Sequence, residues 1–229
     1  MFSLLFEFQP PKEQWDLYLA NKEILRPELE QVQGLVENIR YRSLTRDGWI
    51  LSLSGWRDEP SVFGWHTRMS NHEAQQTRRS QIVGDYRLRV GRVTSDTRIA
   101  EGKGVGESNS DASDADASSY VTLVEAKQTP EWVSSNNPQE IALYLGFDLY
   151  SYGDCISWDV FDAVFNPGEI MLVVTWADAQ SAKDHAATQI VPEDSRVRVV
   201  RVVRDYSMLS GDVAVHRHSD ASDRDQLRA

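Results

Sequence analysis

The feature that most constrains the fold is an internal repeat. Residues 41–65 align without a gap with residues 161–185 when the chain is shifted by 120 positions. Five of the 25 aligned pairs are identical, namely Gly48/Gly168, Ile50/Ile170, Trp56/Trp176, Asp58/Asp178 and Ser61/Ser181. Each copy has the pattern of an apolar strand that ends at a tryptophan, followed by an aspartate that caps a helix. The repeat therefore predicts two similar units in a chain of 229 residues.

Strand and helix patterns around the repeat predict the same order of elements in both units. In the first unit we expect a strand at 2–8, a helix at 12–32 broken near Pro27, a hairpin at 38–56 turning at Asp47-Gly48, a helix from Asp58 to about Ser80 and a strand at 85–93. In the second we expect strands at 119–126, 157–164, 169–176 and 195–203, with helices around 138–147 and 178–189. This β-α-β-β-α-β order is that of a ferredoxin-like unit.

Two such units can bury the exposed sheet faces of each other. A four-stranded sheet with helices on one face leaves its other face bare, and a second sheet can bury it. The predicted fold class is therefore α+β, with two ferredoxin-like units in tandem whose antiparallel sheets pack face to face within one chain. The predicted boundaries are 1–95 for the first unit, 96–119 for an acidic Ser/Gly/Asp-rich linker, 120–208 for the second unit and 209–229 for a disordered tail.

Composition excludes several classes of partner. A formal net charge of -11, from 24 basic and 35 acidic residues, argues against nucleic acid and against an anionic membrane surface. The single cysteine, Cys155, excludes an intrachain disulfide and a cysteine-based zinc site, which favours a reducing, cytoplasmic location. The sequence has no apolar run of the roughly 20 residues that a membrane helix needs. We expect a soluble globular protein that binds a small molecule.

Four runs of the first unit resemble a known family in their order and spacing. RPELEQVQG, YRSLTRDGWILSLSGWRDE, GWHTRMSNHEAQQTRR and DYRLRVGRV are similar to the antibiotic biosynthesis monooxygenase (ABM) domain of the dimeric α/β-barrel superfamily. The resemblance covers nearly all of residues 1–95 and is weaker over 120–206, where it depends on SWDVFDAVFNPGEIMLVVTWADA. It implies an intrachain form of the dimeric α/β barrel, with a pocket in each half between its sheet and its helices.

The resemblance also implies a chemistry. Oxygenases of this family act without a metal or flavin on electron-rich aromatic or enolic substrates, and the substrate supplies the electrons. Such a pocket needs an aromatic wall, a base and a polar group near the developing anion. No cofactor and no metal site are therefore expected. The alternatives are a non-catalytic ligand-binding or structural barrel, and a haem-binding or haem-degrading relative. The chain is expected to be a monomer with a pseudo-dimeric barrel, or a homodimer of such chains.

Trp65 and His72 are the predicted catalytic pair. They lie seven residues apart, close to two helical turns, so both side chains project from one stripe of the helix. Trp65 stands where the family often has a pocket tryptophan, and a neutral His72 can accept a proton near pH 7. The alternative is that Trp65 fills the core with Val62 and Met69, and that His72 is an exposed or hydrogen-bonded helix histidine.

Five further residues are predicted to bind substrate: Ser61, Asn71, Gln75, Tyr86 and Arg87. Tyr86 and Arg87 are adjacent in a strand, so only one of them can face the pocket. Two of the five depart from family patterns. Gln75 occupies the position of the iron-binding histidine of haem-degrading relatives, and Ser61 stands where oxygenases of aromatic polyketides often have asparagine.

The second unit carries fewer chemical groups. His185 takes the position of Trp65 there, and an isolated histidine of this kind is expected at the surface, although a base is the alternative. Glu7 and Glu125 occupy matching places on the two first strands, where the sequence leaves their facing open. Trp56 and Trp176 are expected to pack the core, because both units need them in the same way.

Overall fold

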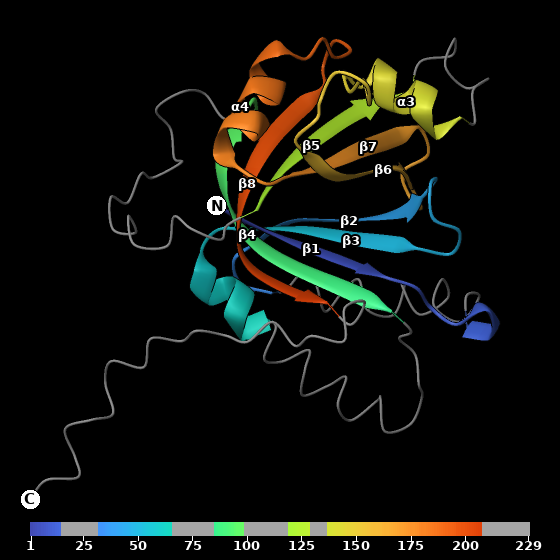
Figure 1. Cartoon of the computed structure of the whole chain (residues 1–229). Helices are drawn as coiled ribbons and strands as arrows, with labels where there is room; N and C mark the ends of the chain where they lie inside the picture. The colour runs from blue at the N-terminus through green and yellow to red at the C-terminus, as the bar shows by residue number, and fades with distance from the viewer. Residues whose placement is uncertain (15–31, 66–84, 99–118, 129–136, 208–229) are drawn as a thin grey trace, which may run out of the picture.

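The computed structural model describes residues 1–14, 32–65, 85–98, 119–128 and 137–207 (Figure 1). Its eight strands form one closed barrel in the order β1-β3-β2-β6-β7-β5-β8-β4. The strands are β1 (Phe2–Phe8), β2 (Leu35–Ser43), β3 (Ile50–Trp56), β4 (Tyr86–Asp96), β5 (Tyr120–Lys127), β6 (Cys155–Ala163), β7 (Glu169–Trp176) and β8 (Arg196–Ser207). The labelled helices are the 3-10 turn η1 (Lys12–Gln14), α3 (Pro138–Tyr144) and α4 (Ala179–Thr188), and residues 59–65 form a further helix.

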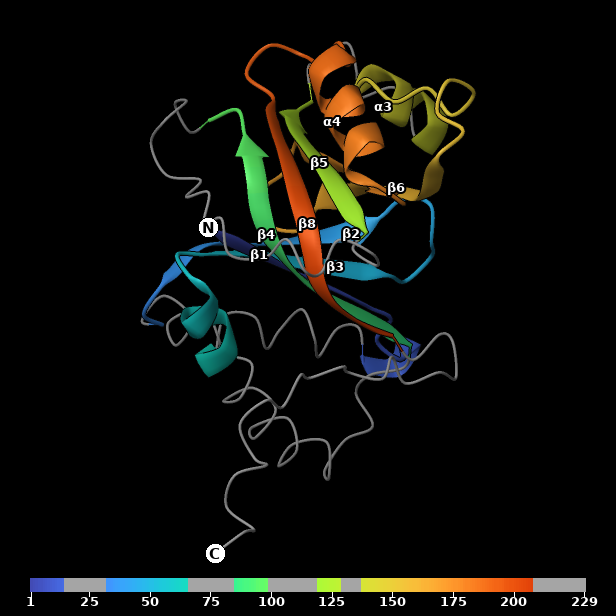
Figure 2. The ribbon, with the colours of Figure 1, turned by 60° about the vertical axis from the view of Figure 1, so that its left-hand side comes forward.

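The prediction of two sheets within one chain is confirmed, and the sheets also join at both edges. One seam pairs β4 with β8 from Arg87↔Ser207 to Asp96↔Arg198. The other seam is short and pairs β2 with β6 only from Tyr41↔Ala163 to Ser43↔Phe161. Figure 2 shows β4 and β8 running side by side along the long seam. The fold is thus an α+β barrel of the dimeric α/β-barrel type, completed by a single chain.

Three separate hydrophobic cores follow from the alternation of side chains along the strands. One core draws on strands of both units and fills the barrel; it includes Leu5, Tyr41, Leu51, Leu53, Val93, Val121, Leu123, Phe161, Ala163, Met171, Val173, Val200 and Val202. The other two lie on the outer faces of the two sheets, under the helices. Figure 1 shows α3 and α4 on one side of the barrel and the 59–65 helix on the opposite side.

The repeated sequence forms the same local structure twice. Gly48 and Gly168 lie in the two hairpins with φ of 74° and 88°, a region that residues with a side chain rarely adopt. Asp178 caps α4, because its carboxylate accepts hydrogen bonds from the backbone N–H groups of Gln180 and Ser181. Trp56 and Trp176 are fully buried in the two outer cores, which confirms their predicted packing role.

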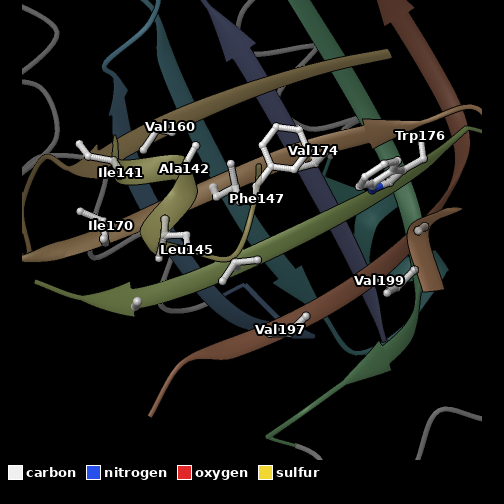
Figure 3. Close-up of a cluster of buried hydrophobic side chains, with 14 residues drawn as sticks. Ile141, Ala142, Leu145, Phe147, Val160, Ile170, Val174, Trp176, Val197 and Val199 are labelled. Carbon is white, nitrogen blue, oxygen red and sulfur yellow. The ribbon is translucent and has the colours of Figure 1, made fainter. Parts of the chain in front are cut away.

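Of the two outer cores, that of the second unit contains more of the described residues. Figure 3 shows Ile141, Leu145 and Phe147 from α3 and the loop after it packing toward Val174, Trp176 and Val199 of the sheet. In the first unit, Val62 of the 59–65 helix is buried against the sheet. The expected helix at 12–32 lies outside the described residues beyond Gln14, as does the expected continuation of the second helix from 66 to about Ser80. Most of the linker and the tail also lie outside them.

A β-bulge changes the facing of the last residues of β8. Gly91 pairs with Val202 and Val90 pairs with Arg204, so Val203 is the extra residue in β8. The side chains beyond Val203 therefore switch sides relative to the preceding alternation. As a result, Arg204 and Tyr206 stand on the outer face of the first unit's sheet, although they belong to the second unit. No helix within the described ranges is long and apolar enough to cross a membrane.

Candidate functional site

Aromatic side chains gather on the helix-facing side of the first unit's sheet. The set comprises Phe6, Trp56, Trp65, Tyr86 and Tyr206, and we call it the first-unit aromatic face. The rings of Trp56 and Trp65 are 6.1 Å apart between centroids, and those of Phe6 and Tyr86 are also 6.1 Å apart. Trp65 is only partly buried, so its ring combines a packing contact with remaining accessible surface. This arrangement can supply an aromatic wall for a small ligand.

The structure brings some of the predicted site residues together and separates others. Trp65 and Tyr86 both belong to the first-unit aromatic face. The Ser61 hydroxyl donates a hydrogen bond of 2.6 Å to Asp58 at the start of the 59–65 helix, so it is engaged in capping. His72, Asn71 and Gln75 lie outside the described residues, and their roles stay predictions.

Arg87 faces the other way from Tyr86, as the alternation within a strand requires. Its Nε and Nη2 donate to the two carboxylate oxygens of Asp205, at 3.1 and 2.7 Å. This bidentate pair joins β4 to β8 on the barrel side of the seam. Of the two adjacent residues that the sequence left as alternatives, Tyr86 is the one that lies on the aromatic face.

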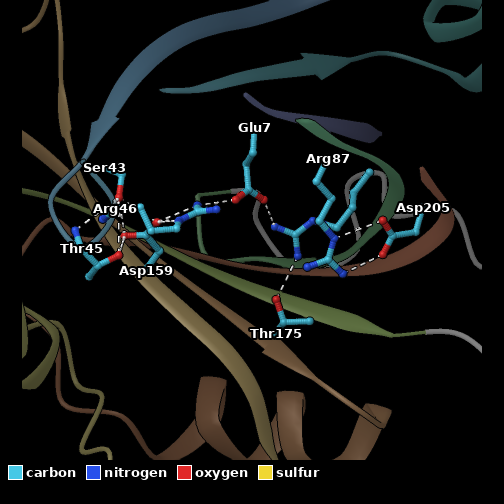
Figure 4. A network of polar contacts seen from close by, with 9 residues as sticks. Glu7, Ser43, Thr45, Arg46, Arg87, Asp159, Thr175 and Asp205 are labelled. Carbon is cyan, nitrogen blue, oxygen red and sulfur yellow. Dashed lines mark hydrogen bonds and ion pairs between the residues drawn. The ribbon is translucent and has the colours of Figure 1, made fainter. Parts of the chain in front are cut away.

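The facing of Glu7, which the sequence left open, is toward the barrel interior. Its carboxylate accepts hydrogen bonds from Arg89 and from Arg46, the latter at 2.5 Å (Figure 4). Arg89 also donates to the Thr175 hydroxyl at 2.9 Å, and Arg46 donates to Asp159 at 2.7 Å. Burial alone raises the pKa of Glu7, but the charges of Arg89 and Arg46 outweigh it and bring the pKa below its ordinary value. Glu7 is therefore an ionised structural group.

Glu125 has an equivalent position in the second unit and also faces inward. It accepts a hydrogen bond from Arg198, which donates in addition to Glu37. Arg196 donates to both oxygens of Asp96, at 3.0 and 2.6 Å, and to Glu37 at 2.7 Å. Burial raises the pKa of Glu125 above its ordinary value. Arg198 lowers this pKa, but the nearby Glu37 carboxylate partly cancels that effect, so the rise due to burial remains. Charged networks therefore stand inside the barrel in both units.

The expectation that His185 lies at the surface is wrong. The side chain is completely buried, because the inner face of α4 meets rings from the loop after α3 and from β7. The ring centroid of His185 lies 5.7 Å from Phe147, 5.0 Å from Tyr152 and 5.1 Å from Trp176. In the second unit, His185 and the rings around it thus fill the place that corresponds to Trp65.

Burial also fixes the protonation state of His185. Desolvation lowers its pKa to about 4, although the nearby Gly146 carbonyl favours the charged form. Neither ring nitrogen makes a hydrogen bond of good geometry within the described part of the chain. His185 is therefore neutral at pH 7, and a role as a haem ligand would require the surrounding rings to move. The residues that the structure describes include no group of three or more His, Cys, Asp or Glu side chains that could hold a metal ion.

Sequence reasoning missed two residues at the first-unit site, Arg204 and Tyr206. If side chains alternated regularly along β8, Arg204 would follow Val200 and Val202 and point into the barrel. The bulge at Val203 reverses this facing. A bulge at a valine leaves no signal in the sequence, since glycine is the residue that marks one most clearly.

Comparisons with known proteins relate most of the chain, including both units, to a curated relative. The chain is 38% identical over 211 residues to the jasmonate monooxygenase ABM of Pyricularia oryzae, which covers 90% of this chain and 93% of that protein. No model of a protein family matches the chain. Among solved structures, an anthrone oxidase-like protein covers 94% of this chain and 96% of its own at a TM-score of 0.35 and 13% identity. An aldoxime dehydratase covers 88% and 80% at a TM-score of 0.49 and 12% identity.

Proposed function

This chain belongs to the ABM monooxygenase family, and we propose that it oxygenates jasmonate or another small carboxylic acid that carries an enolisable ketone, without a metal or flavin. The observation that carries the proposal is the 38% identity with jasmonate monooxygenase ABM, which spans nearly the full length of both chains and so includes both units. A cyclopentanone such as jasmonate falls within the enolic class of substrate that the sequence resemblance implies.

The first-unit aromatic face is the proposed substrate site. Trp65, Tyr86 and Tyr206 are only partly buried there, so their rings can cover the hydrocarbon part of a small ligand. The corresponding place in the second unit is filled by Tyr152 and His185. This difference between the units favours one substrate site per chain.

The proposed reaction needs no external reductant. His72 accepts a proton from the methylene carbon beside the ketone, and the resulting enolate passes its electrons to dioxygen. A carbon–oxygen bond forms to give a hydroperoxide. The same carbon then loses its second proton as the oxygen–oxygen bond breaks, which leaves a new carbonyl group and one molecule of water. The methylene carbon loses four electrons and dioxygen gains four, so the reaction balances.

Incubation of the purified protein with jasmonate and isotopically labelled dioxygen tests this function. We expect a product that gains one labelled oxygen and loses two hydrogens, at the same rate with and without added reduced nicotinamide and flavin. A product that gains oxygen without losing hydrogen, formed only with a reductant, would contradict cofactor-independent chemistry. The absence of any turnover across a panel of small keto acids and phenols would contradict the substrate class.

The His72→Ala variant is expected to lose activity by about 10²- to 10⁴-fold in kcat, because a general base contributes roughly that much. Steady-state oxygen consumption with the turned-over substrate measures this. The matched control is His216→Ala, which removes a histidine from the polar C-terminal segment. Equal turnover by wild type and His72→Ala would show that His72 is not the base, and Trp65 would then be interpreted as a core residue.

A further inference from the structure

We propose that Arg204, which the second unit supplies, binds the carboxylate of the substrate at the first-unit aromatic face. The inference rests on the proposed function for the location of the site, and it adds the group that recognises the acid. Arg204 and Tyr206 reach this face because of the bulge at Val203. Arg204 stands opposite Val90 and Tyr206 opposite Leu88, and both of these β4 residues belong to the first unit's outer core.

The guanidinium of Arg204 is held by two contacts, and one of its terminal nitrogens has no hydrogen-bond partner among the described residues. Its Cζ lies 3.9 Å from the centroid of the Phe63 ring, on the 59–65 helix. Its Nη2 is 3.5 Å from a carboxylate oxygen of Glu59, an ion pair at the limit of hydrogen-bonding distance. Nη1 is buried and has no hydrogen-bond partner within the described residues. A buried cationic donor without an acceptor is unfavourable, so this atom requires an explanation.

A substrate carboxylate supplies the missing acceptor. Arginine has five N–H donors in the plane of the guanidinium, and stacking on an aromatic ring occupies its face and leaves the donors at its edge free. Two of these donors match the two oxygens of a carboxylate. The Phe63 ring thus presents Arg204 in the orientation that bidentate binding needs. The rings of the aromatic face then lie beside the bound acid group, where the hydrocarbon part of the ligand has to go.

The four arginines on the barrel side of β4 and β8 differ from Arg204, and this contrast supports the assignment. Arg87, Arg89, Arg196 and Arg198 each donate to at least one carboxylate inside the barrel. Arg204 is on the outer face, and its Nη1 donates to none of the described groups. The corresponding bulge on β4 lies between Val93 and Ser95, so Ser95 occupies, on the outer face of the second unit's sheet, the place that Arg204 occupies on that of the first. The cation is thus present at the first unit's face and missing at the matching place of the second.

The test compares an acid with its neutral ester. Quenching of tryptophan fluorescence measures the binding of jasmonic acid and of methyl jasmonate to wild type, Arg204→Met and Arg204→Lys. We expect wild type to prefer the acid, and Arg204→Met to bind the acid about 10- to 100-fold more weakly with little change for the ester, as expected for a charged hydrogen-bonded pair. Arg204→Lys keeps the charge without the bidentate geometry and is expected to lie between the two.

Two further variants make the result specific. Lys183→Met removes the same charge from the exposed side of α4, and it is expected to leave both affinities unchanged. Glu59→Gln removes the carboxylate that competes for Arg204, and it is expected to strengthen binding of the acid. An unchanged ratio of acid to ester affinity in Arg204→Met would overturn the proposal.

The design also separates this inference from the proposed function. If wild type binds neither jasmonic acid nor its ester, jasmonate is not the substrate, and naphthylacetic acid and naphthylacetamide replace them as a charged and a neutral aromatic probe. A preference for the acid that disappears in Arg204→Met would then support the carboxylate site even though the substrate was wrong. Equal or absent binding of both probes to wild type would overturn the site itself.

Discussion

The Arg198→Met variant is expected to unfold with a free energy about 3–5 kcal/mol lower than that of wild type. Arg198 is completely buried in the barrel and donates hydrogen bonds to both Glu37 and Glu125. Without the guanidinium, the largely buried Glu125 carboxylate loses its hydrogen-bond donor, and Glu37 keeps only Arg196 as a partner. A buried carboxylate without a donor is what makes such a change costly. Urea denaturation at pH 7, followed by tryptophan fluorescence, measures the difference.

Two variants show whether burial is the cause. The double variant Arg198→Met/Glu125→Gln also removes the carboxylate that has lost its donor, and it is expected to recover part of the loss. Arg42→Met breaks the Arg42–Asp162 pair, in which the arginine side chain is 55% exposed, and it is expected to cost less than about 1 kcal/mol. A stability of Arg198→Met within about 1 kcal/mol of wild type would show that the interior charges are already accessible to water.

Acidification from pH 7 to pH 5 is expected to remove about 2 kcal/mol of stability through His185 alone. Burial lowers the pKa of His185 to about 4 in the folded protein, from 6.5 in the unfolded chain. Between these two values the unfolded chain takes up a proton that the folded protein does not. The contribution is therefore fully present above about pH 6.5 and is lost as the pH falls toward 4.

The His185→Phe variant isolates this effect. Phenylalanine keeps the ring contacts with Phe147, Tyr152 and Trp176 but has no proton to take up. The interior carboxylates titrate in both proteins, so their contribution cancels when the two are compared. Denaturation curves at pH 7 and pH 5 are expected to show a smaller loss for His185→Phe by about 2 kcal/mol. Equal losses in the two proteins would mean that His185 is not neutral at pH 5.

The sequence predicted the architecture because the repeat and the strand patterns agree with each other. The hairpin glycines, the capping aspartates and the two tryptophans are local signals, and each formed the predicted structure. The facing of Glu7 and Glu125 was beyond such reasoning. In β1 and β5 both faces of the strand are buried, one in the barrel and one under the helices, so apolar residues occur on either side. Alternation then shows which residues share a face without showing which face is the interior.

The site was less predictable than the fold for a related reason. The separation of Tyr86 from Arg87 follows from alternation, which is local. The burial of His185 depends on Phe147 and Tyr152, which come from an irregular loop without periodicity. The place of Arg204 depends on a bulge and on pairing with a strand of the other unit. Contacts of this kind arise only when distant segments meet, and no window of sequence contains them.

The long seam between β4 and β8 has a consequence for how such a protein can evolve. Each of its two strands has an arginine near its start and an aspartate toward its other end, so Arg87 meets Asp205 and Arg196 meets Asp96. In a barrel made of two identical chains, one mutation would change both contacts at once, because symmetry repeats it. In a fused chain each copy of the gene segment mutates alone. Equivalent positions such as Arg204 and Ser95 can then change independently. One half can gain a ligand contact while the equivalent residue of the other half changes without affecting that contact.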